Sequence, residues 1–143
     1  MRLKFPHLVA TFTSMKTVLL VEDESTFQMI GKILLRTIGL PPENFYSAQT
    51  GKEALELLDK LTAEGKALPE LILLDVYMPI MDGFGFLEVY ATKEYSGKDK
   101  VTIIALTSSQ DPQHMEKMKQ FGVTKYMTKP LEESKIRAEL MGE

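Results

Sequence analysis

The chain has 143 residues, of which 44% are hydrophobic and 26% are charged, and its formal net charge is −3. This length suits one globular domain with a sizeable core and is too short for a second domain of ordinary size. The acidic balance gives no general attraction to nucleic acid or anionic lipid, no apolar stretch approaches the ~20 residues of a membrane span, and the absence of cysteine excludes disulfides and thiolate catalysis.

The first 15 residues stand apart from the rest. Basic residues precede a short apolar segment at 8–10, which has a faint similarity to a secretion signal, but threonines interrupt this segment and no clear cleavage site follows. We therefore expect residues 1–15 to be an N-terminal tail and residues 16–143 to form the domain. We also expect a cytoplasmic location, with no direct contact with nucleic acid or with a membrane.

Five apolar runs of strand length alternate with segments of helical periodicity. The predicted strands are Thr17 to Val21, Asn44 to Ala48, Leu71 to Leu74, Val101 to Leu106 and Val123 to Met127. Strands that alternate with helices form parallel sheets with right-handed crossovers. The pattern predicts an α/β fold of the doubly wound (βα)5 type, in which helices cover both faces of a five-stranded parallel sheet.

The first two helices have clear end signals. The first is predicted from Ser25 to Ile38, with Gly39 as its C-terminal stop. The second runs from Thr50 to Ala63 and opens with a capping box, Thr50 and Glu53. We expect the inner face of the first helix to consist of Phe27, Ile30, Ile33, Leu34 and Ile38, and that of the second to consist of Ala54, Leu57, Leu58 and Leu61.

Three further helices complete the alternation. The third follows Asp82-Gly83, the fourth begins near Asp111-Pro112 and ends at Gly122, and the fifth runs from about Glu132 to Met141. The expected apolar faces are Phe84, Leu87 and Tyr90 or Ala91 on the third helix, and Met115, Met118 and Phe121 on the fourth. The polar stretch at 93–100 is the longest predicted loop.

Charged side chains follow three of the predicted strands. Glu22, Asp23 and Glu24 come after the first strand, Asp75 after the third and Lys129 after the fifth. Because the carboxyl ends of parallel strands meet at one edge of a sheet, we expect these groups to converge. Mg²⁺ suits such a place, since it prefers a few hard oxygen ligands. A carboxylate beside a metal and an ammonium group is a competent nucleophile toward a phosphoryl group, which makes Asp75 the candidate reactive residue.

Hydroxyl groups end the fourth strand, at Thr107, Ser108 and Ser109. They can donate hydrogen bonds to an anion bound at the sheet edge, or they can cap the helix that follows. Pro130 follows Lys129 directly, and this X-Pro bond is a candidate for the cis conformation.

Taken together, these landmarks resemble the receiver domain of two-component response regulators, of the single-domain chemotaxis type. The resemblance extends from Lys16 to about Met141. It is carried by the acidic pair Glu22-Asp23, by Asp75 within Leu-Leu-Asp-Val-Tyr-Met-Pro-Ile-Met-Asp-Gly, by Thr107 after the fourth strand, by Tyr126, and by Lys129-Pro130. The resemblance implies the flavodoxin-like fold of receivers.

The resemblance also implies a function. Asp75 would accept a phosphoryl group from a phosphohistidine on a sensor histidine kinase or a histidine phosphotransfer protein. Asp23, Asp75 and the backbone carbonyl of Tyr77 would hold Mg²⁺, with Glu22 acting mainly through a water on the metal. Glu22 replaces the commoner Asp, and the bulky Tyr77 is expected to screen the attacking water.

Further residues would transmit the signal. Lys129 would pair with the phosphoryl oxygens, while Thr107 and Tyr126 would form a coupled switch. This switch would change the surface of the fourth helix, the fifth strand and the fifth helix, where an unknown downstream protein target would bind. We expect self-catalysed phosphotransfer and slow autodephosphorylation rather than the turnover of an enzyme.

Three alternative functions are compatible with parts of this pattern. A receiver-like module that binds partners without phosphorylation is disfavoured because the acids, Thr107 and Lys129 are all present. A haloacid dehalogenase-type phosphatase needs a second Asp two residues after the nucleophile, where Tyr77 stands. A flavodoxin-like nucleotide binder needs hydroxyls and amides after its first strand, where Glu22 and Asp23 would repel phosphate.

Overall fold

The computed structural model describes residues 16–78, 81–107 and 112–141. Within these ranges, five strands form one parallel sheet in the order β2-β1-β3-β4-β5. The strands are β1 (Val18–Val21), β2 (Phe45–Ala48), β3 (Leu71–Asp75), β4 (Thr102–Thr107) and β5 (Lys125–Thr128). The prediction of a doubly wound (βα)5 sheet is therefore confirmed, and strand bounds differ from the predicted ones by two residues at most.

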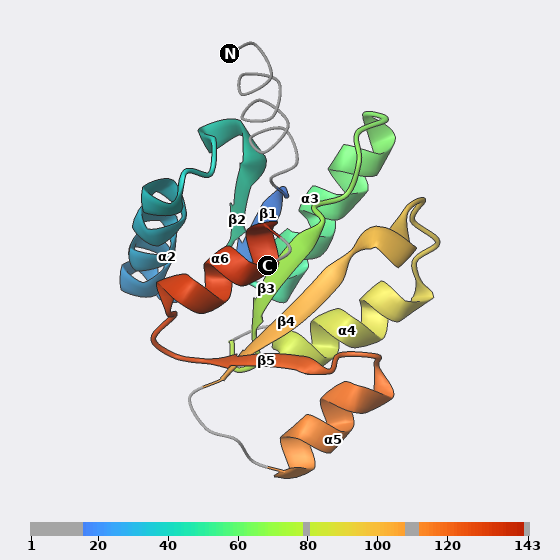
Figure 1. Cartoon of the computed structure of the whole chain (residues 1–143). Helices are drawn as coiled ribbons and strands as arrows, with labels where there is room; N and C mark the ends of the chain where they lie inside the picture. The colour runs from blue at the N-terminus through green and yellow to red at the C-terminus, as the bar shows by residue number, and fades with distance from the viewer. Residues whose placement is uncertain (1–15, 79–80, 108–111, 142–143) are drawn as a thin grey trace.

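Helices cover both faces of the sheet, as Figure 1 shows. They are α2 (Ser25–Ile38), α3 (Gly51–Ala63), α4 (Gly83–Thr92), α5 (Pro112–Gln120) and α6 (Glu133–Met141), with short 3-10 turns η1 (Pro42–Asn44) and η2 (Lys98–Lys100). The apolar side chains of α2 and α6 pack on one face, and those of α3, α4 and α5 pack on the other. None of the helices in the described ranges is long and apolar enough to cross a membrane.

The buried strands supply two cores because successive side chains point to opposite faces of a sheet. In β1, Val18 and Leu20 belong to the core under α2 and α6, whereas Leu19 and Val21 belong to the core under α3, α4 and α5. All residues of β1 and β3 are buried. The apolar runs in the sequence are thus the central strands of the sheet, and their carboxyl ends are held rigidly.

The predicted helix ends are largely confirmed. The Thr50 hydroxyl accepts a hydrogen bond from the Glu53 amide at 3.0 Å, and the Glu53 carboxylate accepts one from the Gln49 amide at 2.9 Å. Gly39 ends α2 with φ of 115°, a left-handed conformation that suits glycine. The Asp82 carboxylate caps α4 by accepting from the Gly85 amide at 2.8 Å.

The expected inner face of α2 is wrong in part. Ile30 and Ile33 are 47% and 55% exposed, while Leu35 is buried. The buried stripe consists of Phe27, Gly31, Leu35 and Ile38. A Cβ atom at Gly31 would lie 2.8 Å from Cδ2 of Leu20, so α2 approaches β1 most closely at a residue without a side chain. The pattern of apolar residues does not reveal such a close contact at a glycine. The predicted buried stripe of α2 therefore lies about one position away from the observed one.

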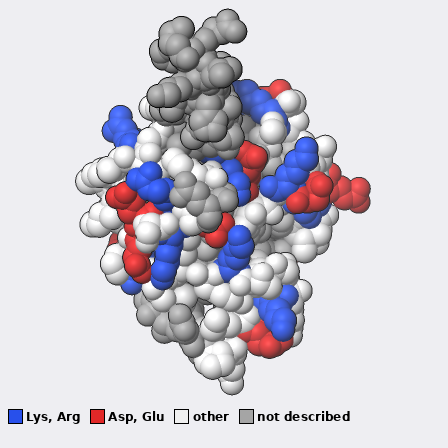
Figure 2. Space-filling view, in the orientation of Figure 1, with Lys and Arg blue, Asp and Glu red and all other residues white. Residues whose placement is uncertain are grey.

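Smaller differences concern single residues. Leu57 is half-buried, whereas Leu55 is buried beside the expected Ala54, Leu58 and Leu61. Phe86, which had not been assigned to the core, is fully buried in α4. The predicted tail at 1–15, Ser108, Ser109 and the predicted cap Asp111 lie outside the described residues. Figure 2 shows basic and acidic side chains interspersed over the face in view.

Candidate functional site

A cavity of about 250 Å³ lies at the carboxyl edge of the sheet. Its walls come from segments that are far apart in the chain: the loop after β1, the end of β3 and the residue after β5. The lining residues are Glu22, Asp23, Glu24, Asp75, Tyr77 and Lys129. The parallel sheet thus brings the predicted charged residues together, as expected from the convergence of its strand ends.

Three of these residues form a compact group of carboxylates. Glu22, Asp23 and Asp75 each offer an oxygen, and these oxygens lie within 4.8 Å of one another. Glu22 and Asp75 are 1% and 4% exposed, whereas Asp23 is exposed. Burial raises the pKa of both Glu22 and Asp75 above the usual range for carboxyl groups, because water no longer stabilises the charged form.

Lys129 joins the two buried acids. Its Nζ lies 2.6 Å from Oε1 of Glu22 and 3.3 Å from Oδ2 of Asp75. Burial lowers the pKa of Lys129, but the hydrogen bond to Glu22 and the two negative charges outweigh this effect, so the pKa lies above its ordinary value. Nζ also lies 4.5 Å from the ring centroid of Phe27, and this cation–π contact stabilises the ammonium group. Lys129 is therefore a charged group held between two carboxylates.

Backbone and amide groups fix the acids in place. The Glu24 amide donates to Oε2 of Glu22 at 3.0 Å, and the Tyr77 amide donates to Oδ1 of Asp75 at 3.3 Å. Gln28, which the sequence had not singled out, donates from Nε2 to the carbonyl oxygens of Glu22 and Ala48, each at 3.0 Å. Gln28 therefore ties the first turn of α2 to the ends of β1 and β2. The bond between Lys129 and Pro130 is cis, as predicted.

The two residues of the expected switch lie beside a small cavity. Thr107 is the last residue of β4 and is buried, and Tyr126 in β5 is half-buried. The Tyr126 hydroxyl donates to the carbonyl oxygens of Met115 and Val123, at 3.0 and 3.1 Å. Both Thr107 and Tyr126 line a void of about 10 Å³ between β4 and α5, which is roughly the room for one water molecule.

A contact between Tyr77 and His114 was missed by sequence reasoning. The Tyr77 hydroxyl is in hydrogen-bonding contact with the imidazole of His114 in α5, and the two rings meet edge to face with centroids 5.3 Å apart. Phe84 packs on the same imidazole at 5.8 Å. Residues 37 positions apart carry no signal of such a contact in one sequence. His7, the other histidine, lies outside the described residues.

The chemistry of the donor set fits a small divalent cation. Carboxylate oxygens are hard ligands of the kind that Mg²⁺ prefers. The exposed Asp23 side chain makes no hydrogen bond or ion pair in the described part of the chain, so its oxygens are available to an ion. Two of the three crowded acids are buried, and within the described residues Lys129 is the only cation that pairs with them. A cation at this edge would complete the balance of charge.

The chain is similar to known proteins over most of its length. Residues 18–141 match the family model of the response regulator receiver domain. The chain is 32% identical over 113 residues to the sensor histidine kinase CheAY of Helicobacter pylori, a match that covers 79% of this chain and 13% of the kinase. The chain spans between 10% and 50% of the length of eight curated relatives that it matches.

Solved structures show the same architecture. A two-component response regulator from Cytophaga hutchinsonii has a TM-score of 0.76 and 25% identity, covering 90% of this chain and 98% of that chain. The receiver domain of the sensor histidine kinase PA1611 from Pseudomonas aeruginosa has a TM-score of 0.69 and 24% identity, with the same coverage. In the latter structure a magnesium ion is coordinated in the active site cleft.

Proposed function

Because the chain belongs to the response regulator receiver domain family, we propose that it is the phosphoacceptor switch of a two-component phosphorelay. Asp75 takes a phosphoryl group from a phosphohistidine of a partner, and the phosphorylated chain signals by binding another protein. The observation that carries this proposal is the contact of Lys129 with both Glu22 and Asp75, at an edge where three carboxylates converge.

In the proposed transfer, a carboxylate oxygen of Asp75 attacks the phosphorus atom of the phosphohistidine. The new oxygen–phosphorus bond forms as the nitrogen–phosphorus bond breaks, and the electron pair of the broken bond returns to the imidazole. Lys129 Nζ, 3.3 Å from Oδ2 of Asp75, places a positive charge where the phosphoryl oxygens would lie. The end of β3 holds the nucleophile in a fixed position, so little reorganisation is needed.

Glu22, Asp23, Asp75 and the backbone carbonyl of Tyr77 are the residues that would hold Mg²⁺. When bound, Mg²⁺ supplies positive charge that offsets the negative charge of the phosphoryl group. Asp23 offers the exposed carboxylate of the cluster. Glu22, whose Oε1 accepts from Lys129 at 2.6 Å, would act on the ion mainly through a water. Support for the metal comes from the three convergent carboxylates of this chain.

The proposed phosphodonor is a sensor histidine kinase or a histidine phosphotransfer protein, and the presence of sensor kinases among the relatives supports it. Thr107 moves to hydrogen-bond the phosphoryl group, and Tyr126 turns inward to fill the space that Thr107 leaves, beside the small cavity that both residues line. This movement changes the surface of α5, β5 and α6, to which a downstream protein binds. We also propose that the protein lies in the cytoplasm and makes no direct contact with nucleic acid or a membrane. It acts as a switch rather than as an enzyme with multiple turnovers.

Intact-mass measurement after incubation with acetyl phosphate and Mg²⁺ tests the proposal. We expect one added phosphoryl group on the wild-type chain and none on the Asp75→Asn variant. Asp99→Asn is a matched control, since Asp99 is an exposed acid in η2 and its loss should leave labelling unchanged. EDTA should abolish labelling of the wild type.

Labelling that survives in Asp75→Asn, or that persists in EDTA, would show that the phosphoryl group enters elsewhere or without the metal. If no labelling occurs with acetyl phosphate or with a phosphorylated histidine kinase, the alternative of a phosphorylation-independent interaction module would replace the proposed function.

A further inference from the structure

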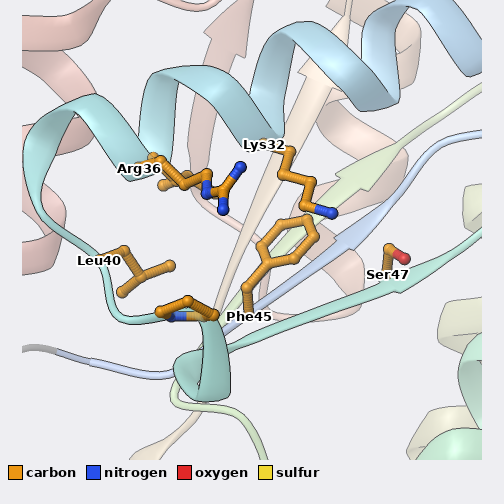
Figure 3. Close-up of a pocket in the computed structure, with 7 residues that line it drawn as sticks. Lys32, Arg36, Leu40, Phe45 and Ser47 are labelled. Carbon is orange, nitrogen blue, oxygen red and sulfur yellow. The ribbon is translucent and has the colours of Figure 1, made fainter.

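A second cavity, of about 310 Å³, lies between α2 and the edge strand β2, toward the amino end of that strand. The helix contributes Lys32, Leu35 and Arg36 to its walls, and the following loop and β2 contribute Leu40, Phe45 and Ser47 (Figure 3). None of these residues belongs to the acid cluster at the carboxyl edge. The cavity is therefore a feature of the fold that the proposed phosphotransfer does not use.

The floor of this cavity is apolar. Leu35 and Leu40 are 1% and 4% exposed, and the half-buried Phe45 presents its ring on the side that faces α2. The volume equals that of roughly ten water molecules and stands at the lower end of the range of about 300–1,000 Å³ for small-molecule sites. A ligand with a single ring or a branched aliphatic body would fill it, whereas a dinucleotide would not fit.

The rim of the cavity is basic. Lys32 and Arg36 are exposed and stand four residues apart on α2, a spacing that places like charges on the same face, where they repel. No ion pair within the described ranges involves either side chain. In Figure 3 the side chains of Lys32 and Arg36 extend from α2 toward the side of β2 that carries Phe45 and Ser47. An anionic group bound there would offset both charges at once.

We propose that this cavity binds a small organic anion with an aromatic or branched apolar body. The carboxylate, phosphonate or phosphate group of the ligand contacts Lys32 and Arg36, whose guanidinium can donate two parallel hydrogen bonds to such a group. The Ser47 hydroxyl lies on the same side of β2 as Phe45 and can donate a further hydrogen bond to the anionic group. The apolar body packs against Phe45 and Leu40. Charge complementarity and the limited volume together select this class of ligand.

An NMR titration of the full chain with phenylphosphonate, in the absence of Mg²⁺, tests the proposal. The probe combines one ring with an anionic group, and its carbon–phosphorus bond prevents transfer to Asp75. We expect saturable amide shifts centred on Leu40, Phe45 and Ser47. Methylphosphonate, which lacks the ring, should bind at least tenfold more weakly, and so should benzyl alcohol, which lacks the charge.

Variants then assign the binding to the basic rim. The double substitution Lys32→Gln/Arg36→Gln should weaken phenylphosphonate binding at least tenfold, and each single substitution should weaken it at least threefold. Lys52→Gln/Lys60→Gln removes the same charge from exposed positions of α3, on the other face of the sheet, and should leave binding unchanged. Thermal melts followed by circular dichroism check that all variants remain folded.

Three results would overturn the proposal. The first is a titration whose shifts are centred on Asp75 and Lys129, which would place the anion at the acid cluster. The second is equal binding of phenylphosphonate, methylphosphonate and benzyl alcohol, and the third is equal loss of binding in the α2 and α3 double variants. None of these results bears on phosphorylation of Asp75, so the two proposals are tested separately.

Discussion

Lys129 sets the charge balance of the acid cluster in the absence of a metal. Glu22 and Asp75 are almost completely buried, and burial raises their pKa values because it disfavours the charged forms. The ammonium group of Lys129 lies within 3.3 Å of both carboxylates. A largely buried carboxylate that loses its cation is only poorly compensated by water. The stability of the metal-free protein should therefore depend on this one side chain.

We predict that Lys129→Met lowers the free energy of unfolding in EDTA by about 1 to 3 kcal/mol, the usual cost of leaving a buried polar or charged group without its partner. Lys125→Met is the control, because Lys125 pairs with Glu139 at the surface, where such pairs contribute about 0 to 1 kcal/mol. Urea denaturation of both variants provides the measurement. Equal effects of the two substitutions would mean that Lys129 does not balance the buried acids.

At the scale of elements, α2 serves two parts of the molecule. Its first turn approaches the acid cluster through Phe27 and Gln28, and its second half lines the basic cavity with Lys32 and Arg36. Its inner stripe packs on β1, closely enough at Gly31 that a Cβ atom would meet Leu20. The outer side carries Met29, Ile30 and Ile33, which are 62%, 47% and 55% exposed. These exposed residues contribute little to the core on which the position of the helix depends.

Alanine substitutions should separate the two sides of α2. Leu35→Ala removes a side chain that is 1% exposed and should cost about 2 to 5 kcal/mol of stability. Ile33→Ala, on the exposed side, should change stability by less than about 0.5 kcal/mol. Chemical denaturation of both variants measures the difference. A larger loss for Ile33→Ala than for Leu35→Ala would instead support the helix face that apolar periodicity predicts.

At the scale of the whole molecule, the stability of the domain should depend on the binding of ions at the carboxyl edge of the sheet. Both cores converge on β1 and β3, and the carboxyl ends of these strands carry the acid cluster. An ion that binds only to the folded chain stabilises it by mass action. Because the ligands come from two different strands and their loops, unfolding separates them, so Mg²⁺ should act on the melting of the entire domain rather than on one loop.

Saturating Mg²⁺, at one hundred times its dissociation constant, should raise the free energy of unfolding by about 2.7 kcal/mol. The Asp23→Asn variant should lose most of this gain. In EDTA its stability should equal or slightly exceed that of the wild type, because the charge that repels the buried Glu22 and Asp75 has been removed. Thermal melts with and without MgCl₂ at constant ionic strength measure both effects, with Asp99→Asn as the control. An undiminished Mg²⁺ effect in Asp23→Asn would remove Asp23 from the metal site.

Much of the candidate site could be predicted because topology, rather than side-chain packing, determines it. Parallel strands end at one edge, so residues that follow β1, β3 and β5 must approach one another, whatever the details of the core. The convergence of Asp23, Asp75 and Lys129 was therefore predictable from their positions directly after, or at the end of, parallel strands. The end signals of α2 and α3 were equally local: Gly39 and the Thr50–Glu53 pair act within one helical turn.

The sequence by itself thus determined the alternation of strands and helices along the chain, the two-sided (βα)5 sheet and the edge at which the acids gather. Only the tertiary structure decided which side of α2 is buried, that Lys129 lies closer to Glu22 than to Asp75, and that Tyr77 meets His114. It also decided that α2 and β2 enclose a basic cavity. The physical reason is that periodicity and capping act between residues a few positions apart, whereas these contacts depend on how closely separate elements pack.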